Sequence, residues 1–415
     1  MKITDLKTIR FKSQSCIQRD PIGHAHPGPA VDTVTTMYVI ETDEGVCGYS
    51  VPDSYNVLNP GAAPQAWAGG DSGDKTANAV AAGSGAGFVE KRLKPILVGE
   101  DPFSREKIFN ILYKMQRGGA NSALTDPLLA HIDKALWDLY GRYANLPVYK
   151  LLGGHRDKVL CYASIQVGDH FKGGLSDPED YAAFAKKCVE MGYPAVKLHT
   201  WADENWGGNN CIGKPSVDKD IACCKAVREA VGPDVELMLD CFHYYDRYDA
   251  YKLGKAIEDL GYIWYEEPME EYNVSSYKWL KSKLNIPIIG PEVAKGKNFT
   301  RAEWIAGGVC DIARVGAGDV GGITPMVKTV HLCESFGIPL EVHSGGAASL
   351  HIMGMMTVPG RYYERGMLHP FLNYCCPPWL NRMIDPMDEH GFVQVPQLPG
   401  LGYDINWDYI NENRL

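Results

Sequence analysis

The sequence predicts an α/β protein whose main part is a barrel of parallel strands, a modified TIM barrel. From about residue 158 onward, apolar runs typical of strands alternate with runs typical of amphipathic helices. Several strands separated by helices indicate a parallel sheet, and this many units favours a closed barrel. Three acidic residues also recur at the ends of three of these strands at equal spacing, as neighbouring barrel strands would place them.

Composition restricts the class of protein. The chain has 415 residues, enough for a large barrel and a smaller second unit, and its formal net charge of −10 argues against nucleic-acid binding. The beginning of the chain alternates like a strand, and no uncharged apolar run approaches about 18 residues, so we expect neither a secretory signal nor a membrane span. Twelve cysteines are scattered along the chain without a CxxC pair, which favours reduced thiols and a cytoplasmic protein.

The elements before the barrel differ from those that follow. The first ~50 residues are typical of antiparallel strands, and residues 52–86 of a loop rich in small residues. A helix is expected from the Asp126–Pro127 pair, since Asp is a good cap and Pro is tolerated in the first turn. Leu128, Ile132 and Leu136 then fall on one face, which indicates ordinary core packing.

Asp240, Glu266 and Glu292 each stand at or just after the C-terminal end of a predicted strand. Consecutive members are 26 residues apart, about one strand–helix unit, so they occupy equivalent places on adjacent strands. Barrel enzymes keep their chemistry at that face. Three carboxylates converging there describe a Mg²⁺ site, whereas any one alone is equally typical of a solvated loop.

Three basic residues are expected to flank this metal site. In the run YPAVKLHT, Lys197 and His199 share one face because strand side chains repeat every two residues, and His343 follows the later strand IPLEV. A base on each side of a bound carboxylate suits proton removal at one face and delivery at the other. The metal would stabilise the enediolate formed between those steps. The alternatives are a structural histidine at position 199 and a lysine that only pairs with the carboxylates.

These residues resemble the mandelate racemase and muconate lactonising enzyme family of the enolase superfamily, nearly from end to end. VKLH is similar to that family's VKxK motif, YEEP to its WxEEP, and GGIT followed by GIPLEVH to its last barrel units. The resemblance implies a (β/α)₇β barrel (126–374) under an α+β capping domain formed by both chain ends (1–125 and 375–415). It also implies Mg²⁺ ligation by the three carboxylates, and Glu364 as the acid that hydrogen-bonds the substrate carboxylate in the enolate.

Two departures from the family pattern bear on the reaction. His199 replaces the second lysine of VKxK, and histidine titrates near neutral pH without the depression that a lysine needs. The family pairs its last histidine with an Asp on the preceding strand, but Gly316 occupies that position, so His343 is expected to lack this carboxylate unless Asp319 reaches it. An unpaired histidine is a weaker base and a serviceable acid, which favours dehydration over racemisation.

The sequence therefore predicts a Mg²⁺-dependent dehydratase of an aldonic or aldaric sugar acid, a hydro-lyase that yields a 2-keto-3-deoxy acid. His199 or Lys197 would take the α-proton and His343 would protonate the leaving β-hydroxide. Epimerisation, racemisation or cycloisomerisation through the same enolate is the enzymatic alternative, and a non-catalytic metal-binding relative is the alternative from another class. A homo-oligomer is expected, whereas nucleic-acid and membrane partners are not.

The substrate class rests on polar and aromatic residues expected over the barrel mouth. Amides and histidines bond hydroxyl groups, and an indole ring covers a C–H face, so such residues suit a polyhydroxylated acid. Each of them is equally compatible with a surface loop that makes no contact. The candidate substrate-binding residues are His24, His26, Trp201, His243 and Glu267.

Overall fold

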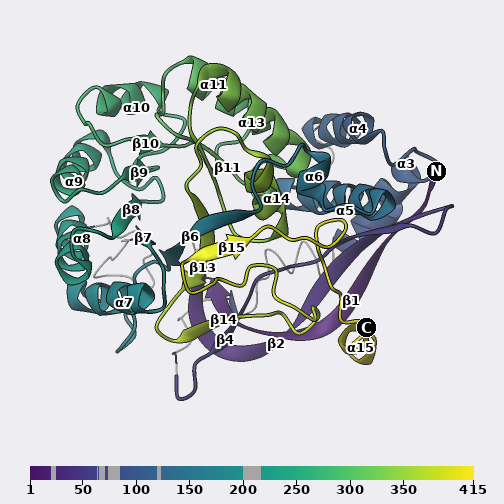
Figure 1. Ribbon diagram of the computed structural model, residues 1–415, viewed down its shortest axis with the longest axis horizontal. Helices are drawn as coiled ribbons and strands as arrows, with labels where there is room; N and C mark the ends of the chain where they lie inside the picture. Colours follow the sequence, from purple (N-terminus) through teal and green to yellow (C-terminus); the bar gives the residue numbers. More distant parts are fainter. Residues whose placement is uncertain (20–24, 63, 65–70, 73–84, 119–122, 200–215) are drawn as a thin grey trace.

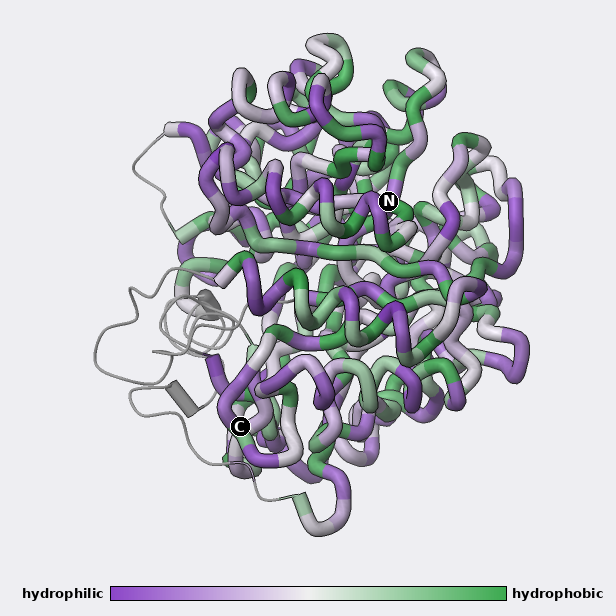
Figure 2. The backbone as a smooth tube through the Cα atoms, turned by 90° about the vertical axis from the view of Figure 1, so that its left-hand side faces the viewer, coloured by the Kyte–Doolittle hydropathy of each residue, from purple (hydrophilic) through white to green (hydrophobic). Residues whose placement is uncertain are grey.

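The structure is a computed structural model, and it describes residues 1–19, 25–62, 64, 71–72, 85–118, 123–199 and 216–415. It shows a ring of strands and helices beside a long antiparallel hairpin (Figure 1). Hydrophobic and hydrophilic residues alternate along most of the tube in Figure 2. Among the described residues, no helix is long and apolar enough to cross a membrane.

The N-terminal part is built on a four-stranded sheet with the order β3-β2-β1-β5. The long strands β1 and β2 pair antiparallel, with Ile9 opposite Met37. Two helices pack against this sheet, since Ile108 of α4 and Ile132 of α5 join Ile40 of β2 in one buried apolar cluster. The elements of this part are β1 (Ile3–Arg19), β2 (Ala25–Thr42), β3 (Cys47–Ser50), β4 (Tyr55–Leu58), β5 (Asp71–Ser72), α2 (Gly85–Phe88), η2 (Val89–Leu93), α3 (Lys94–Leu97), α4 (Arg105–Arg117), α5 (Asp126–Ala144) and α6 (Val148–Leu151).

The barrel strands lie parallel to one another and follow in chain order around a ring. The seven-stranded sheet has the order β10-β9-β8-β7-β6-β13, with β15 added antiparallel on β6. The parallel pair β11–β12 continues this ring, because Ile312 bridges Ile289 of β10 and Leu340 donates to Pro359 just before β13. The barrel strands are β6 (Lys158–Ile165), β7 (Ala195–His199), β8 (Glu236–Asp240), β9 (Trp264–Glu266), β10 (Ile288–Ile289), β11 (Ala313–Val315), β12 (Leu340–Val342) and β13 (Tyr362–Leu368). Two further strands follow: β14 (Leu372–Cys375) pairs antiparallel with β4, and β15 (Phe392–Gln394) is the strand added on β6.

Helices follow the barrel strands and cover the outside of the ring (Figure 1). Their ends carry the expected signals: Asp177 caps α7 in a capping box, and Gly337 ends α13 in the left-handed conformation that glycine tolerates best. The alternation of strand and helix confirms the predicted (β/α)₇β barrel. The helices are α7 (Pro178–Glu190), α8 (Val217–Val231), α9 (Arg247–Asp259), α10 (Val274–Lys281), α11 (Lys297–Ala306), α12 (Ala317–Val320), α13 (Ile323–Phe336), α14 (Ala347–Met355) and α15 (Trp407–Glu412).

The C-terminal tail returns to the N-terminal sheet, as the capping arrangement requires. Arg414 forms a bridge with Phe11 of β1, and the backbone N–H of Lys12 donates to the carbonyl of Asn413. Figure 1 shows α15 beside β1. Both chain ends therefore contribute to one unit next to the barrel, while the exact limits 1–125, 375–415 and 126–374 stay a prediction.

Candidate active site

Three buried carboxylates stand in a row at the C-terminal end of the barrel. Asp240 is the last residue of β8 and lies opposite Glu266, the last residue of β9, while Glu292 follows β10 closely. One oxygen from each lies within 4.8 Å of those of the other two, and their side chains are at most 10% exposed. The structure thus brings together all three residues that the 26-residue spacing singled out.

Two cations inside the barrel hold this row of carboxylates. The ammonium of Lys197 on β7 lies 3.0 Å from Glu266 and 3.4 Å from Asp240. The guanidinium of Arg314 on β11 lies 2.6 Å from Glu266 and 3.1 Å from Glu292. Burial lowers the pKa of Lys197, but nearby carboxylates outweigh it and raise that pKa well above its ordinary value. Lys197 is therefore held as a cation, a role that the sequence analysis left open.

The donor set fits a hard divalent cation. Burial, and then the charges of Glu266 and Asp240 against the opposing cations, raises the pKa of Glu292 well above its ordinary value. Burial therefore disfavours the charge of Glu292, and a cation bound among the three carboxylates would favour it. Carboxylate oxygens are the ligands that Mg²⁺ prefers, and these three leave room for water and substrate oxygens.

His199 flanks the row at its Asp240 end. Its Nδ1 lies 2.5 Å from the carbonyl oxygen of Ile165, and its Nε2 lies 3.2 Å from Asp240. Since a carbonyl only accepts hydrogen bonds, Nδ1 donates to Ile165, and Nε2 is the nitrogen that faces Asp240. His199 therefore points its basic nitrogen toward the carboxylate row.

His343 flanks the row at the other end, and here the sequence expectation is wrong. Its Nδ1 lies 2.7 Å from Asp319, so it has an orienting carboxylate, and its Nε2 lies 3.2 Å from Glu292. Burial lowers the pKa of His343, but Glu292 and Asp319 outweigh it and raise that pKa from 6.5 to about 10. His343 is thus held in the protonated form at neutral pH.

Gly316 explains why Asp319 reaches His343. A Cβ atom at position 316 would lie 2.3 Å from the Asp319 carboxylate and 2.9 Å from Nδ1 of His343, so a side chain there would occupy the same space. Asp319 comes from α12, the single turn that follows Gly316, and folds back into the room that the glycine leaves. The histidine–carboxylate pair is kept, with the acid three residues further along the chain.

Glu364 on β13 lies in the same network. It accepts hydrogen bonds from Ser164 (2.9 Å), Arg314 (2.9 Å) and the backbone N–H of Ser344 (2.8 Å), and Lys197 is 3.1 Å away. Although burial raises the pKa of Glu364, Lys197 and Arg314 outweigh it and lower that pKa well below its ordinary value. These surroundings favour the carboxylate over the protonated acid that the resemblance implies.

The remaining candidate residues separate into three groups. His243 and Glu267 do not join the carboxylate row but form a second group with Glu271, in which His243 lies 3.0 Å from Glu271 and 4.0 Å from Glu267. His26 is fully buried in β2, so its expected contact with substrate stays a prediction. His24 and Trp201 lie outside the described residues.

Sequence reasoning missed two fully buried arginines near the carboxylate row, Arg314 and Arg301. Arg314 is a charged residue in the three-residue buried strand Ala-Arg-Val, a signal that could have been found in the sequence. Arg301 on α11 donates to the carbonyl oxygens of Glu292, Ala294 and Lys297, and so fixes the segment that carries one carboxylate of the row. The pattern of residue types does not predict the hydrogen bonds of Arg301, because their acceptors are backbone carbonyl oxygens.

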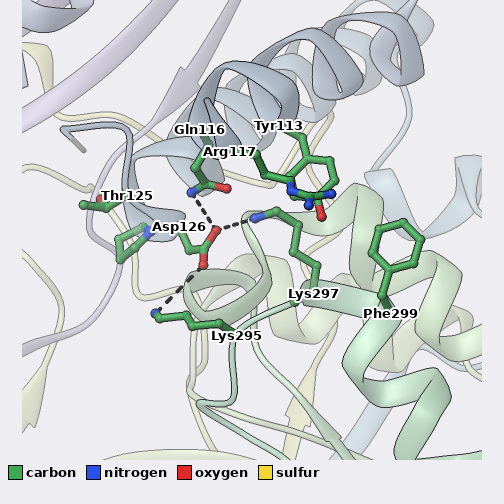
Figure 3. Close-up of a pocket in the computed structure, with 10 residues that line it drawn as sticks. Tyr113, Gln116, Arg117, Thr125, Asp126, Lys295, Lys297 and Phe299 are labelled. Atoms are coloured by element: carbon green, nitrogen blue, oxygen red, sulfur yellow. Dashed lines mark hydrogen bonds and ion pairs between the residues drawn. The ribbon is translucent and has the colours of Figure 1, made fainter. Parts of the chain in front are cut away.

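A separate cavity of about 800 Å³ lies where that segment meets the N-terminal helices (Figure 3). Asp126 at the start of α5 accepts a hydrogen bond from Gln116 at 2.9 Å and pairs with the buried ammonium of Lys297. Lys295 extends toward the same carboxylate at 3.9 Å. The capping helices are thereby tied to the loop that follows Glu292.

Comparison with known families agrees with the fold and the carboxylate row. Residues 180–409 match the family model described as enolase C-terminal domain-like, and residues 29–153 match that of the mandelate racemase/muconate lactonizing enzyme N-terminal domain. Together these matches span most of the sequence. The chain belongs to the mandelate racemase/muconate lactonizing enzyme family of the enolase superfamily.

Several individual relatives are named as sugar-acid dehydratases. The chain is similar to a crystal structure of D-glucarate dehydratase from Agrobacterium tumefaciens complexed with magnesium, with a TM-score of 0.86 and 45% identity over 100% of this chain and 99% of that one. It is 30% identical to arabinonate dehydratase of Saccharolobus solfataricus, covering 76% of this chain and 80% of the relative. It is also 30% identical to L-talarate/galactarate dehydratase of Salmonella typhimurium, covering 79% and 75%.

Proposed function

We propose that the protein is a hydro-lyase that dehydrates a sugar acid, an aldonic or aldaric acid, to a 2-keto-3-deoxy acid. The observation that carries this proposal is the pair of histidines at opposite ends of the carboxylate row, His199 oriented by the carbonyl of Ile165 and His343 by the carboxylate of Asp319. Elimination needs a base and an acid, whereas racemisation needs two groups that exchange roles. The sugar-acid dehydratases among the relatives support the same reaction class.

Asp240, Glu266 and Glu292 would hold Mg²⁺, which supplies Lewis-acid stabilisation of the negative charge that develops on the substrate carboxylate. Around it, Lys197 and Arg314 keep the acidic side chains in place and add positive charge. This local field suits an anionic substrate although the whole chain carries a charge of −10.

In the proposed reaction, Nε2 of His199 takes the proton from the α-carbon. The electron pair left behind moves onto the substrate carboxylate to give an enediolate. When this pair returns, it forms the carbon–carbon double bond of an enol as the bond from the β-carbon to its hydroxyl breaks. The protonated Nε2 of His343 gives its proton to the departing hydroxide, which leaves as water. The enol then tautomerises to the 2-keto-3-deoxy acid, so atoms and charge balance without a further reactant.

The dehydratase proposal does not depend on an unpaired His343. The sequence favoured an acid role for this histidine because position 316 carries no carboxylate, but Asp319 and Glu292 instead make it a cation. A protonated imidazole next to the substrate is the form that general-acid catalysis needs.

The test is a screen of the purified protein with Mg²⁺ against a panel of aldonic and aldaric acids, in which semicarbazide detects 2-keto products. A 2-keto product from one stereochemical series is the expected result. The variant His343→Asn should lose turnover yet keep exchange of the α-proton in deuterated water, because His199 still acts. Loss of both activities would contradict the acid role of His343.

Epimerisation or cycloisomerisation is the second candidate. The chain is 30% identical over 327 residues to D-galactarolactone cycloisomerase of Agrobacterium fabrum, which shows that the family fold also serves isomerisation. A product isomeric with the substrate, together with α-proton exchange and no semicarbazide-reactive product, would favour this candidate over dehydration.

A further inference from the structure

A second group of metal-ligating side chains stands beside the carboxylate row. His243 lies in the loop after β8, Glu267 directly follows Glu266 at the end of β9, and Glu271 lies in the loop before α10. Glu267 lies just past the end of β9 with a positive φ of 34°, and its carboxylate joins His243 and Glu271 instead of the row that Glu266 joins. The two groups are therefore separate, although they share two loops of the barrel mouth.

The distances within this group are those of ligands around one metal ion. One atom from each of the three side chains lies within 4.8 Å of those of the other two. Nδ1 of His243 is 3.0 Å from Glu271 and 4.0 Å from Glu267. Two atoms each about 2.1 Å from a shared ion are about 3.4 Å apart in the tetrahedral arrangement that Zn²⁺ prefers, a value between the two distances found here.

The ligand atoms are buried and available. Glu271 is 2% exposed and Glu267 3%, so burying both charges is costly without a cation between them. Oε1 of Glu271 and Nδ1 of His243 face each other as an ion pair at 3.0 Å, so both atoms point toward the centre of the group. Glu267 uses its other oxygen, Oε1, to accept the backbone N–H of Glu292 at 2.5 Å, which leaves Oε2 for the group.

We propose that His243, Glu267 and Glu271 form a second metal site, which takes a divalent transition-metal ion of the Zn²⁺ type. The imidazole nitrogen distinguishes this site from the carboxylate row, since nitrogen favours zinc and its neighbours over Mg²⁺. The His243 side chain is 30% exposed, which gives the ion a path to the site and leaves space for water as a further ligand. Through Glu267, the ion would also brace the backbone at Glu292. This site is independent of the proposed sugar-acid reaction.

The alternative is a metal-free group in which a protonated His243 bridges the two glutamates. Dialysis of metal-stripped full-length protein against Zn²⁺ in a large excess of Mg²⁺, followed by elemental analysis, separates the two. We expect one tightly held Zn²⁺ per chain, with Glu271→Gln and His243→Ala each weakening it at least tenfold. The matched control Glu303→Gln removes the same charge from an exposed residue of α11 and should retain the ion.

A second variant separates this site from the carboxylate row. Glu292→Gln should weaken Mg²⁺ binding and leave the retained Zn²⁺ in place. Zinc-edge anomalous diffraction from the wild-type protein, with a peak between His243 and Glu271, provides the answer even if a variant does not fold. The proposal is overturned if wild-type protein retains no Zn²⁺ under excess Mg²⁺, or if Glu271→Gln and His243→Ala hold it as tightly as wild type.

Discussion

Replacing Asp319 by Asn tests the histidine–carboxylate pair that the sequence did not lead us to expect. The variant keeps the shape of the side chain and removes the negative charge 2.7 Å from Nδ1 of His343. A charge-assisted hydrogen bond contributes about 1.5–3 kcal/mol, and one pKa unit corresponds to about 1.4 kcal/mol. The pKa of His343, raised to about 10 in the wild type, should therefore fall by about 1–2 units.

The direction of the pH effect on stability follows because Asp319 favours the protonated form of His343. A histidine with a raised pKa stabilises the folded protein fully below its unfolded value of about 6.5, and this contribution is lost as the pH rises through about 10. In Asp319→Asn the stability that His343 contributes should be smaller, and it should be lost at lower pH than in the wild type. The alkaline limb of the pH–rate profile should move to lower pH by the same 1–2 units, because His343 donates the proton.

Histidine-ring NMR of ¹⁵N-labelled protein measures this pKa directly. Asp311→Asn is the matched control, since it removes the same charge at the opposite, N-terminal end of β11 and should leave His343 unaffected. An unchanged pKa of His343 in Asp319→Asn would refute the reasoning.

Three further perturbations follow from buried contacts. Lys297→Met removes the nearest cation of Asp126 and leaves Lys295 at 3.9 Å, so it should destabilise the protein by about 1–3 kcal/mol in urea unfolding, and adding Asp126→Leu should recover most of this; equal stability of wild type and Lys297→Met would contradict it. Arg301→Lys removes bonds that fix Glu292 and should weaken Mg²⁺ binding about 10–100-fold, measured by competition with Mn²⁺ in EPR; unchanged affinity would exclude this positioning role. Burial lowers the pKa of His351 from 6.5 to about 4, so the stability that it contributes is present above about pH 6.5 and lost as the pH falls through about 4; acid unfolding that is the same in His351→Asn would count against it.

The sequence predicted the parts of the site that depend on regular repetition. The carboxylates at 240, 266 and 292 recur because each barrel unit has about the same length, and Lys197 and His199 share a face because strands alternate. Both regularities are properties of secondary structure, so they can be recognised before the chain is folded.

What escaped prediction depends on space and on backbone atoms. Asp319 reaches His343 only because Gly316 has no side chain and one helical turn carries the acid back, which is a matter of three-dimensional room. Arg301 donates hydrogen bonds to backbone carbonyl oxygens, which every residue possesses, so its partners cannot be recognised from residue types. The group around His243 joins three loops whose approach no spacing rule describes.

The ion pairs that Lys197 and Arg314 make with the carboxylates bear on whether the protein can fold before it binds a metal ion. These two cations already offset part of the negative charge of Asp240, Glu266 and Glu292, so the three carboxylates stay together in the folded protein without a metal ion. We therefore expect newly synthesised chains to fold before they bind Mg²⁺. Treatment with a chelator should give a folded but inactive protein, which regains activity when Mg²⁺ is added back. In that respect it is the opposite of a zinc finger, whose architecture collapses when its ion is withdrawn.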